Sequence, residues 1–241
     1  MLKISDVARP GDKIDITFLH QNNGKIYKSS VFDFIDDTIL EIGMPTESGK
    51  MVLFHTGFEG QFFFYTQKGM YICDGKVLDR YKKDGFYMMS VKMLTVPKKY
   101  QRRDYYRVDC AIDFSYYKVT EEVVALEKTE DLFEEIANPK YLVEKKLAVT
   151  KDISGGGIRF IVDEVLEPES YIVIVIRLAN EKIDRTFYLA TQIIACDAIE
   201  KVPDKKVARG KFLFKDVKDR DLIVRFVFEE DRMLRKKENG V

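Results

Sequence analysis

The first half of the chain alternates short apolar runs with turn residues. Between residues 11 and 94, runs rich in β-branched and aromatic residues are separated by segments that contain glycine and asparagine. This is the pattern of antiparallel strands joined by hairpins and loops. The predicted strands cover residues 13–20, 25–34, 51–56, 61–67, 70–79 and 86–94. We therefore expect this half to form a small antiparallel barrel or sandwich.

A second β-rich region follows a break at Pro97. Its predicted strands cover residues 108–119, 145–153, 156–162, 170–179, 186–200 and 207–214. A segment from Glu121 to Lys140 interrupts them, and its DLFEEIA stretch favours a short helix inside a surface insertion. The expected fold is mainly β, with two small antiparallel β domains, the first of which is a barrel or a sandwich.

The chain ends in a helical pattern. The apolar residues that recur at helical spacing are Leu222, Ile223, Phe226, Val227 and Leu234. Asp219 is expected to cap the helix, and the basic residues 235–237 complement the dipole at its C-terminal end. We expect the apolar stripe to pack on its own barrel, with a partner surface as the alternative.

These patterns divide the chain into four parts. We assign residues 1–96 to an N-terminal β-barrel domain and residues 97–108 to a basic linker. Residues 109–217 form the second β-barrel domain, and residues 218–238 form a C-terminal amphipathic α-helix.

Composition and charge narrow the range of functions. Forty basic and 40 acidic residues give a formal net charge of zero, which argues against a protein that coats nucleic acid or an anionic membrane. The N-terminus lacks the apolar core of a secretory leader, and no apolar run reaches the length of a membrane span. Three widely spaced cysteines fit a reducing compartment. We expect a cytoplasmic protein without membrane insertion.

The residues that metal sites and hydrolases use are sparse. His20 and His55 are the only histidines, and neither has an acidic or cysteine neighbour at ligand spacing. No serine, cysteine or histidine stands in a nucleophile motif, and the triple glycine lacks the Gly-Lys-Ser/Thr ending of a phosphate-binding P-loop. We expect no metal, no cofactor and no enzymatic activity.

Two motifs stand out against this background. The linker carries five basic residues and one acid, and within it Arg103-Asp-Tyr-Tyr-Arg107 forms an R-x-x-x-R motif directly after Arg102. The second motif, Asp152-Ile-Ser154-Gly155-Gly156-Gly157, stands where a strand must turn. Alone, either motif would fit a solvated linker or an ordinary hairpin. Together, and in this order beside a β domain, they indicate a ligand site.

The chemistry of these residues suits a guanine nucleotide. A guanidinium can bridge the O6 and N7 atoms of guanine, grip phosphate or stack on a base. The Asp152 carboxylate matches the two parallel donors, N1–H and N2–H, that guanine has and adenine lacks. Ser154 can donate to a phosphate oxygen, while the glycines permit positive φ and a close approach of backbone N–H groups.

Residues from about 97 to 216 resemble a PilZ domain, whose signature joins these two motifs, and the whole chain resembles the two-domain flagellar brake proteins. The resemblance implies a six-stranded PilZ barrel after a split-barrel domain, with cyclic di-GMP held at their junction. The implied ligand-binding residues are Arg102, Arg103, Arg107, Asp152, Ser154, Gly155, Gly156 and Gly157. Arg102 resembles the arrangement that favours a stacked pair of ligand molecules. The insertion at 121–140 is the main departure from the family pattern.

The resemblance further implies a non-enzymatic cyclic di-GMP receptor whose domains reorient when the ligand binds. Its implied partner is a flagellar motor protein, which would recruit it to the flagellar basal body. Nucleic acid is not an expected partner. Two alternatives stay open: control of exopolysaccharide synthesis or secretion, and an RNA-binding β-barrel, because basic and aromatic residues are interleaved in residues 98–107.

Overall fold

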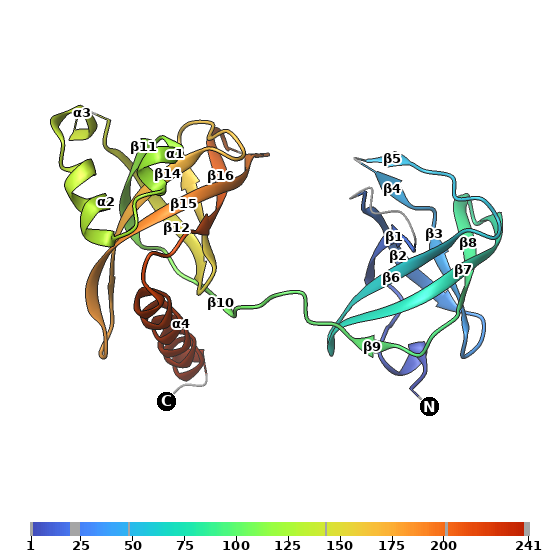
Figure 1. Ribbon diagram of the computed structural model, residues 1–241. Helices are drawn as coiled ribbons and strands as arrows, with labels where there is room; N and C mark the ends of the chain where they lie inside the picture. Colours follow the sequence, from blue (N-terminus) through green and yellow to red (C-terminus); the bar gives the residue numbers. More distant parts are fainter. Residues whose placement is uncertain (1, 20–24, 48, 143, 201, 239–241) are drawn as a thin grey trace. The chain divides into compact units, whose positions relative to one another are not determined.

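The chain forms two compact units that divide between Arg102 and Arg103. A computed structural model describes residues 2–19, 25–47, 49–142, 144–200 and 202–238 (Figure 1). Each unit contains its own closed antiparallel sheet and its own hydrophobic core, so each is described by itself.

The first unit is a six-stranded barrel with short additions. The barrel order is β1-β6-β7-β8-β3-β2, and pairing of β1 with β2 closes it. Its strands are β1 (Lys13–Phe18), β2 (Tyr27–Phe34), β3 (Ile39–Gly43), β6 (Glu59–Thr66), β7 (Gly69–Lys83) and β8 (Phe86–Met93). The additions are the 3-10 turn η1 (Ile4–Asp6), β4 (Thr46–Glu47), β5 (Lys50–Met51) and β9 (Lys98–Lys99).

Alternation along the strands builds the core of this barrel. In β6, Phe62 and Phe64 are fully buried, whereas Phe63 and Tyr65 between and after them are not. Successive side chains of a strand point to opposite faces, so the aromatic block divides between the core and the outer surface. The outward Phe63 packs edge to face with Tyr100, with ring centroids 5.3 Å apart.

Two sequence-based strand assignments in this unit are wrong. β3 was not among the predicted strands, yet it pairs with both β2 and β8. The predicted strand at 51–56 is almost entirely loop, because only Met51 belongs to a strand. In that loop Phe54 is buried against Phe58, with ring centroids 4.1 Å apart. Phe54 therefore adds to the barrel core from a loop and not from a strand.

The second unit is also a six-stranded barrel, so the predicted fold class is confirmed. The order is β12-β11-β14-β15-β16-β13, closed by pairing of β12 with β13, and β10 lies outside on β12. The strands are β10 (Arg107–Asp109), β11 (Asp113–Val119), β12 (Lys146–Ser154), β13 (Gly157–Val162), β14 (Tyr171–Ala179), β15 (Asp184–Ile199) and β16 (Val202–Phe212).

The insertion between β11 and β12 adds a small helical layer to this barrel (Figure 1). It contains α1 (Glu121–Val124), α2 (Thr129–Ile136) and α3 (Pro139–Leu142). Leu132 and Ile136 of α2 are buried in a separate hydrophobic cluster with Val173 of β14 and Ala190 of β15. The insertion therefore covers the outer face of the sheet and contributes a core of its own.

The C-terminal helix α4 (Val217–Glu238) packs on the second barrel through its first half. Ile223, Phe226 and Val227 are buried in the barrel core cluster, whereas Leu234 is 39% exposed. The apolar stripe thus packs on the barrel only in part. The expected cap is also wrong, because Asp219 lies within the helix and Asp216 accepts a hydrogen bond from the Lys218 N–H at 2.8 Å.

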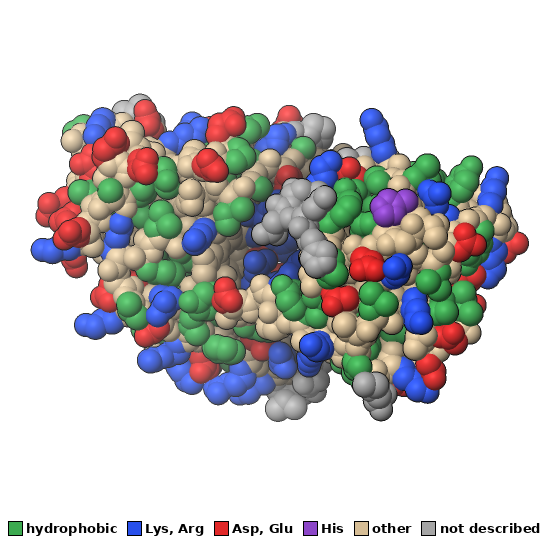
Figure 2. All heavy atoms as spheres, turned by 45° about the vertical axis from the view of Figure 1, so that its right-hand side comes forward, with side chains coloured by type: hydrophobic (Ala, Val, Ile, Leu, Met, Phe, Trp, Pro, Cys, Tyr) green, Lys and Arg blue, Asp and Glu red, His purple; other side chains and the backbone are tan. Residues whose placement is uncertain are grey.

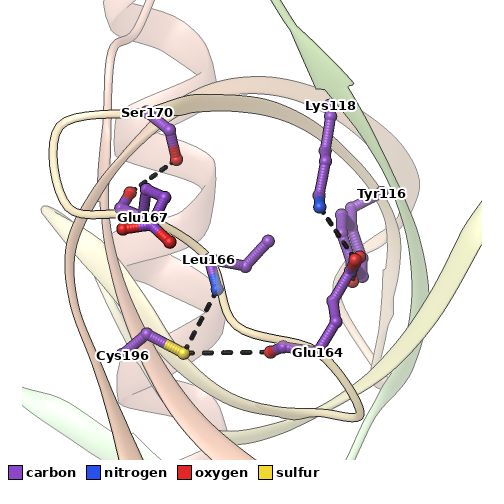
Figure 3. Close-up of polar contacts among 7 residues, drawn as sticks. All are labelled: Tyr116, Lys118, Glu164, Leu166, Glu167, Ser170 and Cys196. Atoms are coloured by element: carbon purple, nitrogen blue, oxygen red, sulfur yellow. Dashed lines mark hydrogen bonds and ion pairs between the residues drawn. The ribbon is translucent and has the colours of Figure 1, made fainter.

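One end of the second barrel is closed by the loop after β13 (Figure 3). Leu166 of this loop is buried in the barrel core. Its N–H contacts the Cys196 sulfur at 3.5 Å, and Glu164 accepts hydrogen bonds from the Tyr116 hydroxyl at 2.7 Å and from Lys118 at 2.8 Å. Burial, followed by the bond to Glu164, raises the pKa of Tyr116. These contacts hold the loop against the end of the barrel, so this polar cluster has a structural role.

The surface charges are mixed, as the zero net charge predicts. In the view of Figure 2, basic and acidic side chains are interspersed with apolar ones over the visible face. Within the described residues, no helix combines the length and apolar character that crossing a bilayer requires.

Burial raises the pKa of Cys73 to about 12, so this thiol is not a ready nucleophile at neutral pH.

Candidate functional site

Strand pairing brings the two sequence motifs together. β10 begins at Arg107 and runs antiparallel to the end of β12. In this register Arg107 lies opposite Ser154, and Asp109 lies opposite Asp152. The second arginine of the R-x-x-x-R motif therefore lies beside the hairpin that carries the serine and the glycines. Two segments far apart in the sequence form one edge of the second barrel.

The glycine-rich motif is a tight hairpin turn. Ser154 and Gly157 are paired, and Gly155 and Gly156 form the two-residue loop between β12 and β13. The Ser154 hydroxyl donates to the Gly157 carbonyl at 3.1 Å and accepts from the Gly156 N–H at 3.4 Å. In the structure this hydroxyl stabilises the turn, and its expected contact with a phosphate stays a prediction.

Space explains the three glycines. None of Gly155, Gly156 and Gly157 has a positive φ, so the expectation that they supply this conformation is wrong. A Cβ on Gly157 would overlap the carbonyl oxygen of Gly210 on β16. A Cβ would lie 2.6 Å from the Tyr105 ring at Gly155 and 2.9 Å from it at Gly156. Side chains are excluded here because the Gly210 backbone and the Tyr105 ring pack closely on the turn, and not because the turn requires a positive φ.

Asp152 is a buried carboxylate with a cationic partner. Its residue is only 4% exposed, and the Arg159 Nε donates to Oδ2 at 2.5 Å while Nη2 contacts the same oxygen. Sequence reasoning missed Arg159. A signal was present, because a two-residue turn at Gly155 and Gly156 places Asp152 directly opposite Arg159.

The two tyrosines of the R-x-x-x-R motif were also missed. Tyr105 lies against the glycine turn, and Val224 of α4 approaches the same glycine, Gly155. The Tyr106 hydroxyl donates to Asp231 of α4 at 2.8 Å. This bond, followed by the one from Arg235, lowers the pKa of Asp231. The motif therefore anchors both the hairpin and the helix.

The remaining arginines lie on either side of the division between the units. Arg103 begins the second unit and is exposed. Arg102 ends the first unit, where its Nη1 donates to the Tyr65 hydroxyl at 2.9 Å and its guanidinium lies 5.6 Å from the centre of the Tyr65 ring. Tyr65 in turn donates to Asp15 at 2.5 Å. Burial, and next the bond to Asp15, raises the pKa of Tyr65.

Arg102 also borders a cavity of about 700 Å³ in the first unit. Its polar lining includes Lys13, Asp15, Lys28 and Tyr65. Three cations against one acid make this cavity electropositive. The structure thus assembles Arg107, Asp152, Ser154 and the glycines at one edge of the second barrel, and it places Arg102 beside a basic cavity of the first.

The described residues contain no group of three His, Cys, Asp or Glu side chains arranged to hold a metal ion. His55 Nδ1 lies 3.2 Å from the carbonyl oxygen of Thr56, in the loop before β6. His20 lies outside the described residues.

Solved structures share this two-unit architecture. The inhibitor of motility from Bacillus subtilis, MotI/DgrA, matches with a TM-score of 0.70 and 19% identity, covering 95% of this chain and 99% of that one. The YcgR protein of Escherichia coli, solved in complex with cyclic di-GMP, matches with a TM-score of 0.51 and 13% identity, covering 95% and 88%. At these identities the matches show the fold. A sequence comparison with curated proteins gives no match.

Family models match both units. Residues 9–93 match the model described as flagellar protein YcgR, and residues 101–229 match the PilZ domain model. The second match includes both sequence motifs and spans more than half of the chain. The chain therefore belongs to the PilZ-domain family and carries the YcgR-type N-terminal domain before its PilZ barrel.

Proposed function

We propose that this protein is a non-enzymatic receptor for cyclic di-GMP. The observation that carries the proposal is the pairing of β10 with β12, which sets Arg107 beside Ser154 and the glycine turn. A buried acid, an arginine and a turn with closely packed backbone then share one edge of a rigid barrel. Family membership supports the same reading, as does the E. coli YcgR structure, which was solved with this ligand.

The ligand has complementary groups. Its two guanines present N1–H and N2–H donors to the Asp152 carboxylate, and O6 and N7 acceptors to a guanidinium fork. Its phosphates can be bound by Arg103 or Arg107, both of which are exposed at the start of the second unit. This arrangement assigns base selection to Asp152, and it assigns contacts to guanine and to phosphate to the arginines.

Competition binding tests the proposal. Fluorescently labelled cyclic di-GMP should bind the full chain, and unlabelled cyclic di-GMP should displace it. GTP and a single-stranded RNA of random sequence should not compete at similar concentrations. Displacement by RNA with a steep salt dependence would support the RNA-binding alternative instead.

The aromatic residues of the basic segment bear on the RNA-binding alternative. Tyr105 lies on the glycine turn, whereas Tyr100 is 36% exposed and Tyr106 is 45% exposed. Stacking of successive bases requires exposed aromatic rings along a groove. The competition experiment therefore decides between the nucleotide and RNA.

The output that we propose is control of motility through a protein partner, by a change in domain orientation. One similar structure is that of an inhibitor of motility, and the first unit matches the YcgR model. Because the units divide between Arg102 and Arg103, a ligand bound by both arginines would fix the backbone that joins the units. The ligand-bound form would then present one arrangement to a motor protein at the flagellar basal body.

Small-angle scattering and limited proteolysis test the reorientation. Saturating cyclic di-GMP should change the scattering curve of the full chain and slow tryptic cleavage after Arg102 and Arg103. Bound ligand could slow cleavage simply by shielding the two sites from trypsin, so the test requires both the scattering curve and the cleavage rate. An unchanged scattering curve at saturation would contradict the reorientation while leaving binding intact.

Swimming assays separate the two biological outputs. Deleting the gene is expected to change swimming in a soft-agar assay, with exopolysaccharide production unchanged. The opposite result would favour the role in exopolysaccharide synthesis or secretion.

A further inference from the structure

Arg159 is the nearest cation to the proposed base-reading carboxylate. It lies on β13 directly across from Asp152 on β12. Its Nε and Nη2 both contact Asp152 Oδ2, the first at 2.5 Å. The Asp152 side chain is 6% exposed and that of Arg159 is 38% exposed. The cation therefore reaches from the surface to a carboxylate that water scarcely touches.

Burial makes this ion pair consequential. Ile153 belongs to the barrel core, so the neighbouring Asp152 side chain points to the opposite face of the sheet. An ionised carboxylate shielded from water needs a charged or hydrogen-bonding partner to remain ionised. Arg159 supplies that partner. Deleting it would leave a buried carboxylate without its cationic partner.

The geometry also fixes the direction of the carboxylate. Both contacts of the guanidinium are with Oδ2, so the ion pair holds this oxygen in place. A register shift between Thr150 and Asp152 interrupts the ladder immediately before this pair. Such bulges commonly re-aim a side chain next to a functional site.

We propose that Arg159 is a positioning residue that makes the site selective for guanine, by holding the Asp152 carboxylate in one orientation. The inference rests on the proposed function and deepens it. An ionised carboxylate only accepts hydrogen bonds, so it matches the N1–H and N2–H donors of guanine and rejects the N1 acceptor of adenine. A carboxylate that Arg159 no longer holds in place would present its acceptors to those donors less well.

The chain offers a matched control for the loss of one arginine. Arg209 on β16 lies directly opposite Arg159 on the far side of β13. Its side chain is 51% exposed, and it has an acidic partner of its own, Asp197, at 2.8 Å. Replacing either arginine with methionine removes one positive charge from the same sheet, but only Arg159 contacts Asp152.

The test compares affinities for cyclic di-GMP and cyclic di-AMP in the full chain. In Arg159→Met the selectivity for cyclic di-GMP, measured as the ratio of the two Kd values, should fall by at least about 10-fold, because the carboxylate is no longer held toward the guanine donors. Arg159→Lys should restore part of the ratio, since one ammonium replaces a two-pronged fork. Arg209→Met should keep the ratio of the unmodified protein.

Three outcomes overturn the proposal. An unchanged ratio in Arg159→Met, or an equal fall in Arg209→Met, would show that Arg159 does not act through Asp152. If Arg159→Met does not fold, Arg159→Lys decides: a ratio lower by roughly threefold supports positioning, because one of two contacts is lost, and an unchanged ratio contradicts it. If the unmodified protein binds neither dinucleotide, the proposed function itself is wrong.

Discussion

Replacing Arg107 with alanine is expected to weaken cyclic di-GMP binding by about 10-fold to 100-fold. Loss of a bidentate arginine contact to guanine costs roughly 1–3 kcal/mol, and each 1.4 kcal/mol is about a factor of 10. Because Arg107 pairs with Ser154 through its backbone, the alanine variant keeps this β10 pairing. The side chain is exposed, so stability should change by less than about 0.5 kcal/mol.

Arg103→Ala should lose affinity in the same range. Calorimetric titration with cyclic di-GMP measures the affinity of both variants. Arg177→Ala is the matched control, since Arg177 is an exposed arginine that forms an ion pair with Asp184 at 2.7 Å on β14 and β15. Its affinity should equal that of the unmodified protein. If Arg103→Ala or Arg107→Ala binds as tightly as this control, with an unchanged circular dichroism spectrum, that arginine does not contact the ligand.

Cyclic di-AMP is expected to bind at least about 100-fold more weakly than cyclic di-GMP. A site built to hydrogen-bond a ligand donor rejects analogues without it, because its buried polar group is left without the partner. Asp152 is 4% exposed, so water cannot replace the missing donors. Competition against labelled cyclic di-GMP measures both affinities in one assay.

The Asp152→Asn variant checks the cause of this selectivity. An amide has both donors and an acceptor, so the variant should discriminate less between the two dinucleotides. Similar affinities for both ligands in the unmodified protein would show that Asp152 does not read the base.

The two-barrel fold was predictable because most strands bury one face. In β1 the buried Ile14 and Ile16 alternate with polar residues, and this alternation is visible in the sequence. β3 shows no such alternation, since Leu40, Glu41 and Ile42 are buried in succession. Glu41 is buried because Tyr81 and Lys83 of β7 bind its carboxylate. That burial depends on tertiary contacts, which a pattern of apolar residues cannot reveal.

The candidate site was predictable in its residue types but not in its internal contacts. The sequence indicates Arg107, Asp152 and Ser154 as ligand residues, yet their proximity depends on the pairing of β10 with β12. Tyr105 packs on the glycine turn, and Val224 of α4 approaches the same turn. Such contacts are made between segments far apart in the sequence, so no local pattern encodes them.

Helix capping shows the same limit on a smaller scale. Asp216 and Asp219 both stand at the start of the helical pattern, and aspartate commonly caps the N-terminus of a helix. The structure uses Asp216, while Asp219 is buried and contacts Arg185 at 2.9 Å. Burial raises the pKa of Asp219, an effect that the charge of Arg185 opposes.

Calorimetric titration of the full chain with cyclic di-GMP tests the central claim most directly. We predict saturable binding with a stoichiometry of one or two ligands per chain, and loss of most of the affinity when Arg103 and Arg107 are both replaced by alanine. The absence of saturable binding in a folded preparation, or equal binding by the double variant, would contradict the account.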